Sequence, residues 1–410
     1  MPRNLAHRLS VVAPSVTLAM NARAAELRAK GVDVFAFGVG EPDFEPPSFV
    51  LEAAKAAIDK GASKYTAVTG IAPLKQAICA ATTRARGWTP TPDMVCVSVG
   101  AKHALFNLAL ALYEPGDEVL IPAPYWVSYP EQVRIVGAEP VIVQTREADG
   151  WRMSPEDLRA ALTPKTKAVI LCSPSNPSGT AYDEAQLRAL LDVLRAHDCW
   201  LIVDEIYAEL TYDGFKHASV ARLAPDMLDR IIIIDGVSKS YAMTGWRIGW
   251  SIAPKHVAKA LDMVQGQSTT NASAVAQHAA LAALTGDQAE LARMRGQFEK
   301  RRNAMVAGLN SLPGVKCRTP EGAFYAFADC RGLYGLPWNG KTLQSDEDIA
   351  FWLLDRAHVA AVPGGAFGAP GYVRFSYALS EERIAKGIAS IRAAIDEARA
   401  GNGEARAAVG

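Results

Sequence analysis

The chain has 410 residues, of which 50% are hydrophobic and 21% are charged, a globular composition long enough for about two or three domains. Lys and Arg together number 43, as do Asp and Glu, so the net charge of zero gives no reason to expect a nucleic-acid partner. No stretch of about 18 apolar residues predicts a membrane span, and residues 1–8 lack the apolar core of a secretion signal.

The N-terminal part is predicted to be helical with one short strand. Ser15 is a candidate N-cap for a helix over residues 16–30, and residues 32–37 have the composition of a strand. The following residues 38–44 (GVGEPDF) place two glycines ahead of a Pro-Asp turn, which lets backbone approach a ligand. A plain tight turn explains the same residues equally well. Another amphipathic helix is expected over residues 47–60.

From residue 94 the sequence alternates between apolar strands and helices, which predicts a mainly parallel sheet covered on both faces. The expected strands lie at residues 94–99, 119–121, 141–143, 168–172, 200–203 and 231–234. Gly100, Ala101 and Lys102 connect the first of them to a helix over 103–112. Such a turn directs free N–H groups and the helix dipole at one point, which favours a phosphate, although small residues are common in this position without a ligand.

Polar or aromatic residues follow several of these strands where a structural role alone does not require them. They are Trp126, Asn176 and Asp204, and finally Lys239, which lies just beyond the four isoleucines of residues 231–234. Each has an ordinary explanation, as a core aromatic, a turn former, a helix cap or a surface lysine. Their joint occurrence predicts a site at the carboxyl edge of the sheet, where open α/β sheets bind ligands.

After residue 255 the chain is expected to be helical to about residue 310, with a break at 271–273, and then to form a smaller α+β domain. Its strands are expected at 322–327, 359–362 and 373–377, before a helix over 381–400. The predicted division is an N-terminal segment that completes the small domain (1–45), a large ligand-binding domain (46–290) and the small C-terminal domain (291–410).

Other chemistries have weaker support. Residues 335–342 (GLPWNGKT) match a phosphate-binding loop, and residues 200–205 resemble its acidic partner strand, but the loop does not directly follow a buried strand and the order is reversed. No GxGxxG follows a strand. Six scattered cysteines without a CxxC pair, and dispersed histidines, indicate reduced thiols in a cytoplasmic protein and no metal centre.

Motifs along nearly the whole chain resemble those of class I aminotransferases of fold type I, which depend on pyridoxal phosphate. The similarity is greatest to bacterial aspartate aminotransferases of subgroup I-beta, which include aspartate/prephenate enzymes. The matching motifs, in family order, are GEPDF at 40–44, KY at 64–65, PYW at 124–126, SNP at 175–177, DEIY at 204–207, SK at 238–239 with GWR at 245–247, and RFSYA at 374–378.

The resemblance implies a role for each residue around the cofactor ring. Lys239 would bind the cofactor as a Schiff base and then move the proton between the substrate Cα and the cofactor. Asp204 would keep the pyridine nitrogen protonated. Tyr207 and Asn176 would hydrogen-bond the phenolic oxygen of the ring, and Trp126 would stack on its face.

The phosphate group has its own implied set of ligands. The backbone N–H groups of Gly100, Ala101 and Lys102 would bind it together with Arg247. Related chains often have glycine where this chain has Ala101, so the backbone there must avoid positive φ. Tyr65 would reach the phosphate of a neighbouring subunit, which implies a homodimer with shared active sites.

For the substrate, the resemblance implies contacts with Gly40, Trp126, Asn176, Arg374, Lys102, Ser15 and Thr17. Arg374 would hold the α-carboxylate in a bidentate pair, assisted by the Gly40 N–H. Lys102 would bind the distal carboxylate of aspartate, with Ser15 and Thr17 as hydroxyl donors. We expect aspartate as donor and 2-oxoglutarate or a related 2-oxo acid as acceptor in a ping-pong cycle, with prephenate as a further acceptor. An aromatic or broad-specificity aminotransferase and a pyridoxal-phosphate-dependent lyase remain alternatives.

Overall fold

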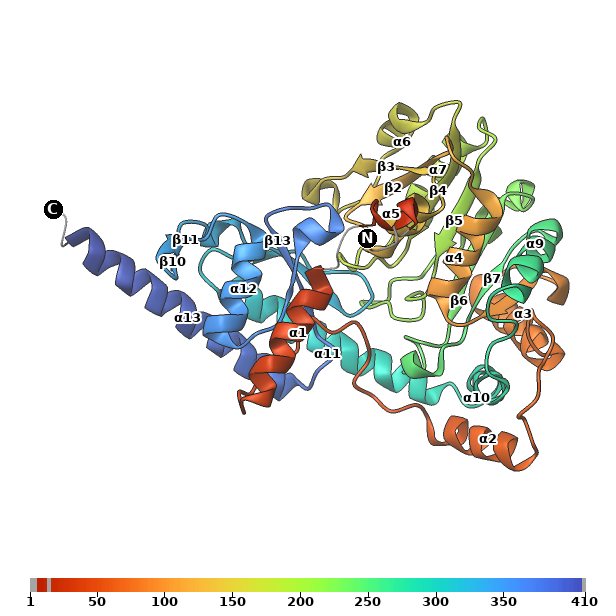
Figure 1. Ribbon diagram of the computed structural model, residues 1–410, viewed down its shortest axis with the longest axis horizontal. Helices are drawn as coiled ribbons and strands as arrows, with labels where there is room; N and C mark the ends of the chain where they lie inside the picture. Colours follow the sequence, from red (N-terminus) through yellow and green to blue (C-terminus); the bar gives the residue numbers. More distant parts are fainter. Residues whose placement is uncertain (1–5, 13–15, 408–410) are drawn as a thin grey trace, which may run out of the picture.

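The computed structural model describes residues 6–12 and 16–407, which form two regions, each built around its own sheet (Figure 1). The large region contains a seven-stranded sheet with the order β1-β7-β6-β5-β4-β2-β3. Its strands are β1 (Val95–Ser98), β2 (Glu118–Ala123), β3 (Glu139–Gln144), β4 (Thr166–Cys172), β5 (Trp200–Asp204), β6 (Ile231–Gly236) and β7 (Gly249–Ile252). Strands β2 to β6 are parallel, which confirms the predicted sheet.

Strand β7 was not expected from the sequence. It has only four residues, begins with a glycine, and pairs antiparallel with both β1 and β6. Its two partners are separated by 132 residues of chain, from Ser98 to Ile231, so no local pattern marks it. The chain therefore returns through the sheet immediately after the segment that carries Lys239.

Alternate residues of β6 face opposite sides of the sheet, and both sides are buried. Ile231 and Ile233 belong to one hydrophobic cluster, and Ile232 and Ile234 belong to another. This is the burial expected of a central parallel strand covered by helices on both faces. The helices of the large region are α2 (Ser48–Asp59), α3 (Ala72–Arg86), α4 (Ala101–Leu112), α5 (Ser128–Ile135), α6 (Pro155–Ala161), α7 (Glu184–Leu194), α8 (Val220–Leu223), α9 (Lys255–Gly266) and α10 (Ala274–Thr285).

The small region contains an antiparallel sheet with the order β12-β13-β9-β8. Its strands are β8 (Lys316–Cys317), β9 (Tyr325–Asp329), β12 (Val362–Pro363) and β13 (Tyr372–Ser376), and its helices are α1 (Val16–Ala29), α11 (Ala289–Ser311), α12 (Asp346–Ala357) and α13 (Glu381–Ala407). The strand expected over residues 32–37 is wrong. Only Phe35 pairs there, in a single bridge to Val359, and the strand expected from 359 begins at Val362.

The segment that matched a phosphate-binding loop forms a β-hairpin. Strands β10 (Pro337–Trp338) and β11 (Lys341–Thr342) pair antiparallel around a turn in which Asn339 and Gly340 have φ of 47° and 78°. The Lys341 ammonium lies 2.7 Å from Asp348. A two-residue turn of this kind is typical of a hairpin, so the alternative of a nucleotide hydrolase is excluded.

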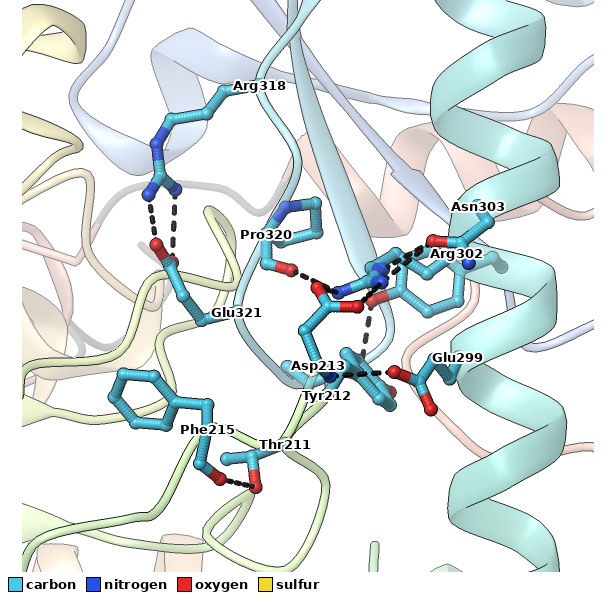
Figure 2. A network of polar contacts seen from close by, with 12 residues as sticks. Thr211, Tyr212, Asp213, Phe215, Glu299, Arg302, Asn303, Arg318, Pro320 and Glu321 are labelled. Atoms are coloured by element: carbon cyan, nitrogen blue, oxygen red, sulfur yellow. Dashed lines mark hydrogen bonds and ion pairs between the residues drawn. The ribbon is translucent and has the colours of Figure 1, made fainter.

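A polar network fastens the two regions to each other at one junction (Figure 2). Arg302 on α11 is fully buried and binds the carboxylate of Asp213 in the large region through two hydrogen bonds of 2.7 and 2.9 Å. The Arg302 guanidinium also donates to the carbonyl of Pro320 at 3.2 Å. Nearby, the backbone N–H of Ala323 donates to the Leu210 carbonyl at 2.9 Å. The junction thus joins the small region to the segment that follows β5. No helix in the described ranges is long and apolar enough to cross a membrane.

Candidate active site

A cavity of about 1380 Å³ lies at the carboxyl edge of the large sheet and is closed on one side by the small region. Most of the predicted site residues line it: Gly40, Ala101, Lys102, Trp126, Asn176, Asp204, Tyr207, Lys239, Arg247 and Arg374. The sheet explains this meeting, because β4, β5 and β6 are parallel neighbours in register and their ends lie at one edge. The sheet therefore brings Asn176, Asp204 and Lys239 together, whereas Gly40 and Arg374 reach the cavity from outside these strands.

Lys239 is half-buried on the floor of this cavity. Its Nζ donates a hydrogen bond of 2.7 Å to the carbonyl of Gly40. Burial lowers the pKa of Lys239 to about 8; Glu41 raises it, and Arg247 and Arg374 lower it further. The neutral amine that a nucleophile or base requires is consequently far more populated near neutral pH than in an ordinary lysine.

Asp204 ends β5 and is 4% exposed. One carboxylate oxygen accepts from the Tyr129 hydroxyl at 2.7 Å, and the other accepts from the Ile206 backbone N–H at 3.1 Å. Burial raises the pKa of Asp204 to about 6, against the two hydrogen bonds and Lys239, which lower it. The carboxylate is thus held in a fixed orientation and suits a cationic partner inside the cavity.

The turn at the start of α4 offers two free backbone donors rather than the three expected. Gly100 has φ of 84°, and its N–H donates to the Ser98 carbonyl at 2.7 Å. Ala101 does not have positive φ, as its side chain requires. The N–H groups of Ala101 and Lys102 have no hydrogen-bond partner among the described residues, as is usual for the first turn of a helix.

Arg247 completes this anion-binding turn. It has a left-handed backbone with φ of 58°, and its guanidinium donates to the carbonyl of Thr244 at 2.9 Å. A Cβ on Gly100 would lie 2.5 Å from Arg247 Nη2, so only glycine admits the cation this close. A cation, two free N–H groups and a helix N-terminus together favour a phosphate.

Two glycines bring the catalytic strand and this turn into direct backbone contact. A Cβ on Gly249 would lie 2.3 Å from the Ala101 nitrogen, and a Cβ on Gly236 would lie 2.9 Å from the Cα of Gly249. Strands β6 and β7 and the turn of α4 are therefore stacked with no space for a side chain. The position of the turn depends on the position of β6.

Arg374 lies on β13 and is 5% exposed. It donates to the Asn176 side-chain oxygen and to the Gly38 carbonyl, both at 2.8 Å. Its guanidinium carbon lies 4.4 Å from the ring centroid of Tyr325 and 5.1 Å from that of Phe367. Its Nε is buried without a partner, so the guanidinium retains donors for a carboxylate in the cavity.

The two groups expected near a phenolic oxygen are bonded to the small region. The Tyr207 hydroxyl lies 2.9 Å from the Tyr325 hydroxyl. Because Asn176 uses its amide oxygen to accept from Arg374, its NH₂ group is the remaining donor. At the rim of the cavity, the Lys102 ammonium lies 4.9 Å from the ring centroid of Trp126. Burial and Arg247 lower the pKa of Lys102.

Some predicted residues are not brought into the cavity. Tyr65 is 88% exposed in the loop between α2 and α3, away from the cavity lining. Ser15 lies outside the described residues, and for Thr17 only its backbone position in α1 is described. The Gly40 carbonyl accepts from Lys239, whereas its N–H was expected to serve the substrate.

Sequence reasoning missed Tyr129 and Tyr325. Tyr129 follows Trp126 by one helical turn, and that spacing was a usable signal for a second aromatic residue at the strand end. Tyr325 lies on β9 in the other region, and no local signal connects it with Tyr207. Both hydroxyls orient groups that were predicted.

Comparisons with known proteins agree with this geometry. The family described as Aminotransferase class I and II matches residues 32–391. The chain is 44% identical to aspartate aminotransferase of Rhizobium meliloti (strain 1021), over 95% of this chain and 96% of that protein. It is 45% identical to aspartate/prephenate aminotransferase of Cereibacter sphaeroides, over 95% and 98%.

Solved structures give the same result. The aspartate aminotransferase from Rhizobium meliloti has a TM-score of 0.93 at 44% identity, over 96% of this chain and 99% of that one. Aspartate aminotransferase from Thermus thermophilus with maleate has a TM-score of 0.90 at 42% identity, over 96% and 100%. The chain therefore belongs to the family of class I and II aminotransferases.

Proposed function

We propose that this chain is a pyridoxal-phosphate-dependent aminotransferase that moves the amino group of an α-amino acid, aspartate first, to 2-oxoglutarate or a related 2-oxo acid. The observation that carries the proposal is the meeting of Lys239, Asp204 and Arg374 in one cavity. An amine with lowered pKa, an oriented carboxylate and a buried guanidinium with a free donor are the three groups that this reaction needs.

The residues of the cavity fit the cofactor. The free N–H groups of Ala101 and Lys102, with Arg247, suit its phosphate. The Asp204 carboxylate suits a protonated pyridine nitrogen, and the Lys239 amine suits the carbonyl carbon to which it would bind covalently. When bound, the cofactor supplies an electron-withdrawing ring that stabilises negative charge at the substrate Cα.

In the proposed reaction, each of these side chains has a separate role. Lys239 Nζ would take the proton from the substrate Cα and return it on the cofactor side. Arg374 holds the α-carboxylate, and its contacts with Asn176 and Gly38 fix the guanidinium plane. The Asp204 carboxylate would pair with the protonated ring nitrogen, and its hydrogen bonds from Tyr129 and the Ile206 N–H hold it in one orientation for that role.

The preference for aspartate is supported by the rim of the cavity. Lys102 places an ammonium beside Trp126, where a distal carboxylate would find a cation. Relatives at about 45% identity are named aspartate or aspartate/prephenate aminotransferases, and a Thermus relative was solved with maleate, a dicarboxylate. Ser15 and Thr17 are proposed as further donors. An aromatic donor is the second candidate, favoured by Trp126 and Phe367 in the lining.

We also propose a cytoplasmic homodimer in which Tyr65 reaches the phosphate site of the partner subunit. Support comes from the exposure of Tyr65 and of two apolar side chains on the packed helices α4 and α9, Leu110 (46%) and Met263 (67%). The division at residues 45 and 290 is proposed as well, since the two sheets have separate cores. Light scattering on the eluting peak of a sizing column tests the dimer.

The function is tested with the purified protein loaded with pyridoxal phosphate. We expect aspartate to turn over only when 2-oxoglutarate is present, with product amino acid and product 2-oxo acid in equal amounts. The same assay with phenylalanine measures the alternative donor. Continuous release of ammonia and a 2-oxo acid from a donor that carries a leaving group on Cβ, without an acceptor, would identify a lyase and contradict the proposal.

A further inference from the structure

A buried arginine lies behind the strand ends that carry the catalytic residues. Arg86, the last residue of α3, is 8% exposed and binds three carboxylates. Its Nε donates to Glu205 at 2.8 Å, Nη1 to Glu209 at 2.7 Å and Nη2 to Asp235 at 3.1 Å. His217 lies 3.3 Å from Glu205. We call these five residues the Arg86 cluster.

The cluster joins the two strands on which the catalytic groups depend. Glu205 directly follows Asp204 at the end of β5, and Asp235 precedes Lys239 by four residues in β6. Arg86 binds both acids, so one guanidinium spans the ends of both strands. The strands are also paired in the sheet up to Asp204 and Ile234, and the backbone N–H of Glu205 donates to the carbonyl of Ile234 at 2.8 Å.

The cluster has no part in the catalytic cavity. A second cavity of about 340 Å³ is lined by Arg86, Glu209, Asp235 and Ser240, and among the described residues it shares no lining residue with the first. Because Lys239 lines one cavity and Ser240 the other, the segment after β6 is the wall between them. Asp235 and Lys239 therefore lie four residues apart on this wall.

The charges of the cluster also reach the site. Burial alone would raise the pKa of Glu205, yet His217 and Arg86 hold it below its ordinary value, so Glu205 is an anion next to Asp204. Burial raises the pKa of Asp235 to about 7, against Arg86, which lowers it. Glu205 raises the pKa of Asp204, so the Arg86 cation offsets a negative charge that acts on Asp204.

We propose that Arg86 is a positioning residue for transamination, which ties the ends of β5 and β6 together through Glu205 and Asp235 and so fixes Asp204 and Lys239 relative to each other. The inference rests on the roles given above to Lys239 and Asp204. It adds a function for a residue outside the catalytic cavity.

The test compares Arg86→Met, Arg86→Lys and Glu205→Gln with Arg302→Met, which breaks the buried ion pair at the junction of the two regions. Three quantities are measured: the pH midpoint of the visible absorption band of the loaded enzyme, kcat and KM for aspartate, and amide hydrogen exchange over residues 234–241 of the cofactor-free protein. Amide hydrogen exchange measures the local stability of the segment between the two cavities independently of catalysis.

Arg86→Met should lower kcat at least about tenfold with little change in KM and raise the pH midpoint by about one unit, since uncompensated acids favour the protonated form. It should also speed local exchange about tenfold. Arg86→Lys should recover part of each loss. Glu205→Gln should move the midpoint in the opposite direction, because it removes a negative charge but keeps an acceptor. Arg302→Met should lower the melting temperature but leave the pH midpoint of the absorption band and the amide exchange over residues 234–241 unchanged.

Wild-type midpoint, kcat and exchange in a folded Arg86→Met protein would overturn the proposal, as would equal shifts in Arg302→Met. If Arg86→Met does not fold, the Glu205→Gln variant tests the proposal by itself. An unchanged pH midpoint of its absorption band would then overturn the proposal. A wrong proposal for the function would give a different result. Wild-type protein would then lack an absorption band that depends on Lys239, regardless of any substitution at Arg86.

Discussion

The floor and the rim of the catalytic cavity are built differently. On the floor, Asp204 is 4% exposed and accepts from the distant Tyr129 hydroxyl and from the neighbouring Ile206 N–H. Arg374 is 5% exposed and donates to Asn176 and Gly38, both in distant parts of the chain. At the rim, Lys102 is exposed, and its ammonium lies 4.9 Å from the ring centroid of Trp126. Several hydrogen bonds fix each side chain of the floor, whereas a side chain at the rim can be replaced without disturbing the fold. We infer that the floor sets the reaction and the rim sets the substrate.

The comparison is tested most severely by Lys239→Ala. Removal of the Lys239 amine should reduce transamination by several orders of magnitude, since base catalysis alone contributes about 10²–10⁴-fold. The variant should fold, because Nζ makes one hydrogen bond, to Gly40. Steady-state turnover with aspartate and 2-oxoglutarate measures the loss, with circular dichroism as the folding control. Wild-type turnover would refute the role of Lys239.

Asp204→Ala should have the next largest effect. Loss of one partner from a buried ion pair typically costs about 3–5 kcal/mol, and here the ring nitrogen would lose its proton. Stopped-flow measurement of the half-reaction with aspartate should show a corresponding fall in rate. If the rate is unchanged, Asp204 only orders the backbone at the end of β5 through its bond from the Ile206 N–H.

Lys102→Ala tests the rim. Loss of the cation near Trp126 should reduce kcat/KM for aspartate by about 2–5 kcal/mol in transition-state binding, and the value for phenylalanine by far less. The ratio of the two values in wild type and variant isolates the substrate effect from any effect on the cofactor phosphate. Equal losses for both donors would assign Lys102 to the phosphate alone.

Tyr129→Phe should have the smallest effect. It removes the hydroxyl that donates to Asp204 at 2.7 Å and preserves the ring that packs edge-to-face on Trp126. A hydrogen bond to a charged group is worth about 1.5–3 kcal/mol. Without it the pKa of Asp204 should rise, so Asp204 is protonated at higher pH and activity should be lost earlier on acidification. A pH–kcat profile with an unmoved acidic limb would contradict this.

The sequence predicted the residues of the cavity floor better than the residues that hold them in place. Four isoleucines in β6 could be recognised as a strand buried on both faces, and the parallel sheet then placed Lys239 and Asp204 at one edge. The hydroxyls of Tyr129 and Tyr325 could not be placed, because each acts across 75 or 118 residues of chain and depends on how helix α5 or the small sheet packs.

Weak local patterns account for the remaining errors in the fold. Residues 32–37 are apolar enough for a strand, but only Phe35 finds a pairing partner. Strand β7 was overlooked because it has four residues and one of them is Gly249. Propensity describes such segments poorly, since pairing with distant strands decides their conformation. The third backbone donor expected at Gly100 failed for a similar reason, as the tight turn directs its N–H to Ser98.

The stacked glycines have a consequence for directed evolution of this enzyme. At Gly249 the same atoms form the sheet and support the turn of α4, so no side chain there can alter cofactor binding without also altering the fold. A library randomised at this position should yield glycine almost exclusively, under selection for solubility as well as for activity. The side chain of Lys102 is not needed for the fold in this way. Substitutions that change the substrate preference should therefore be sought first at positions such as Lys102.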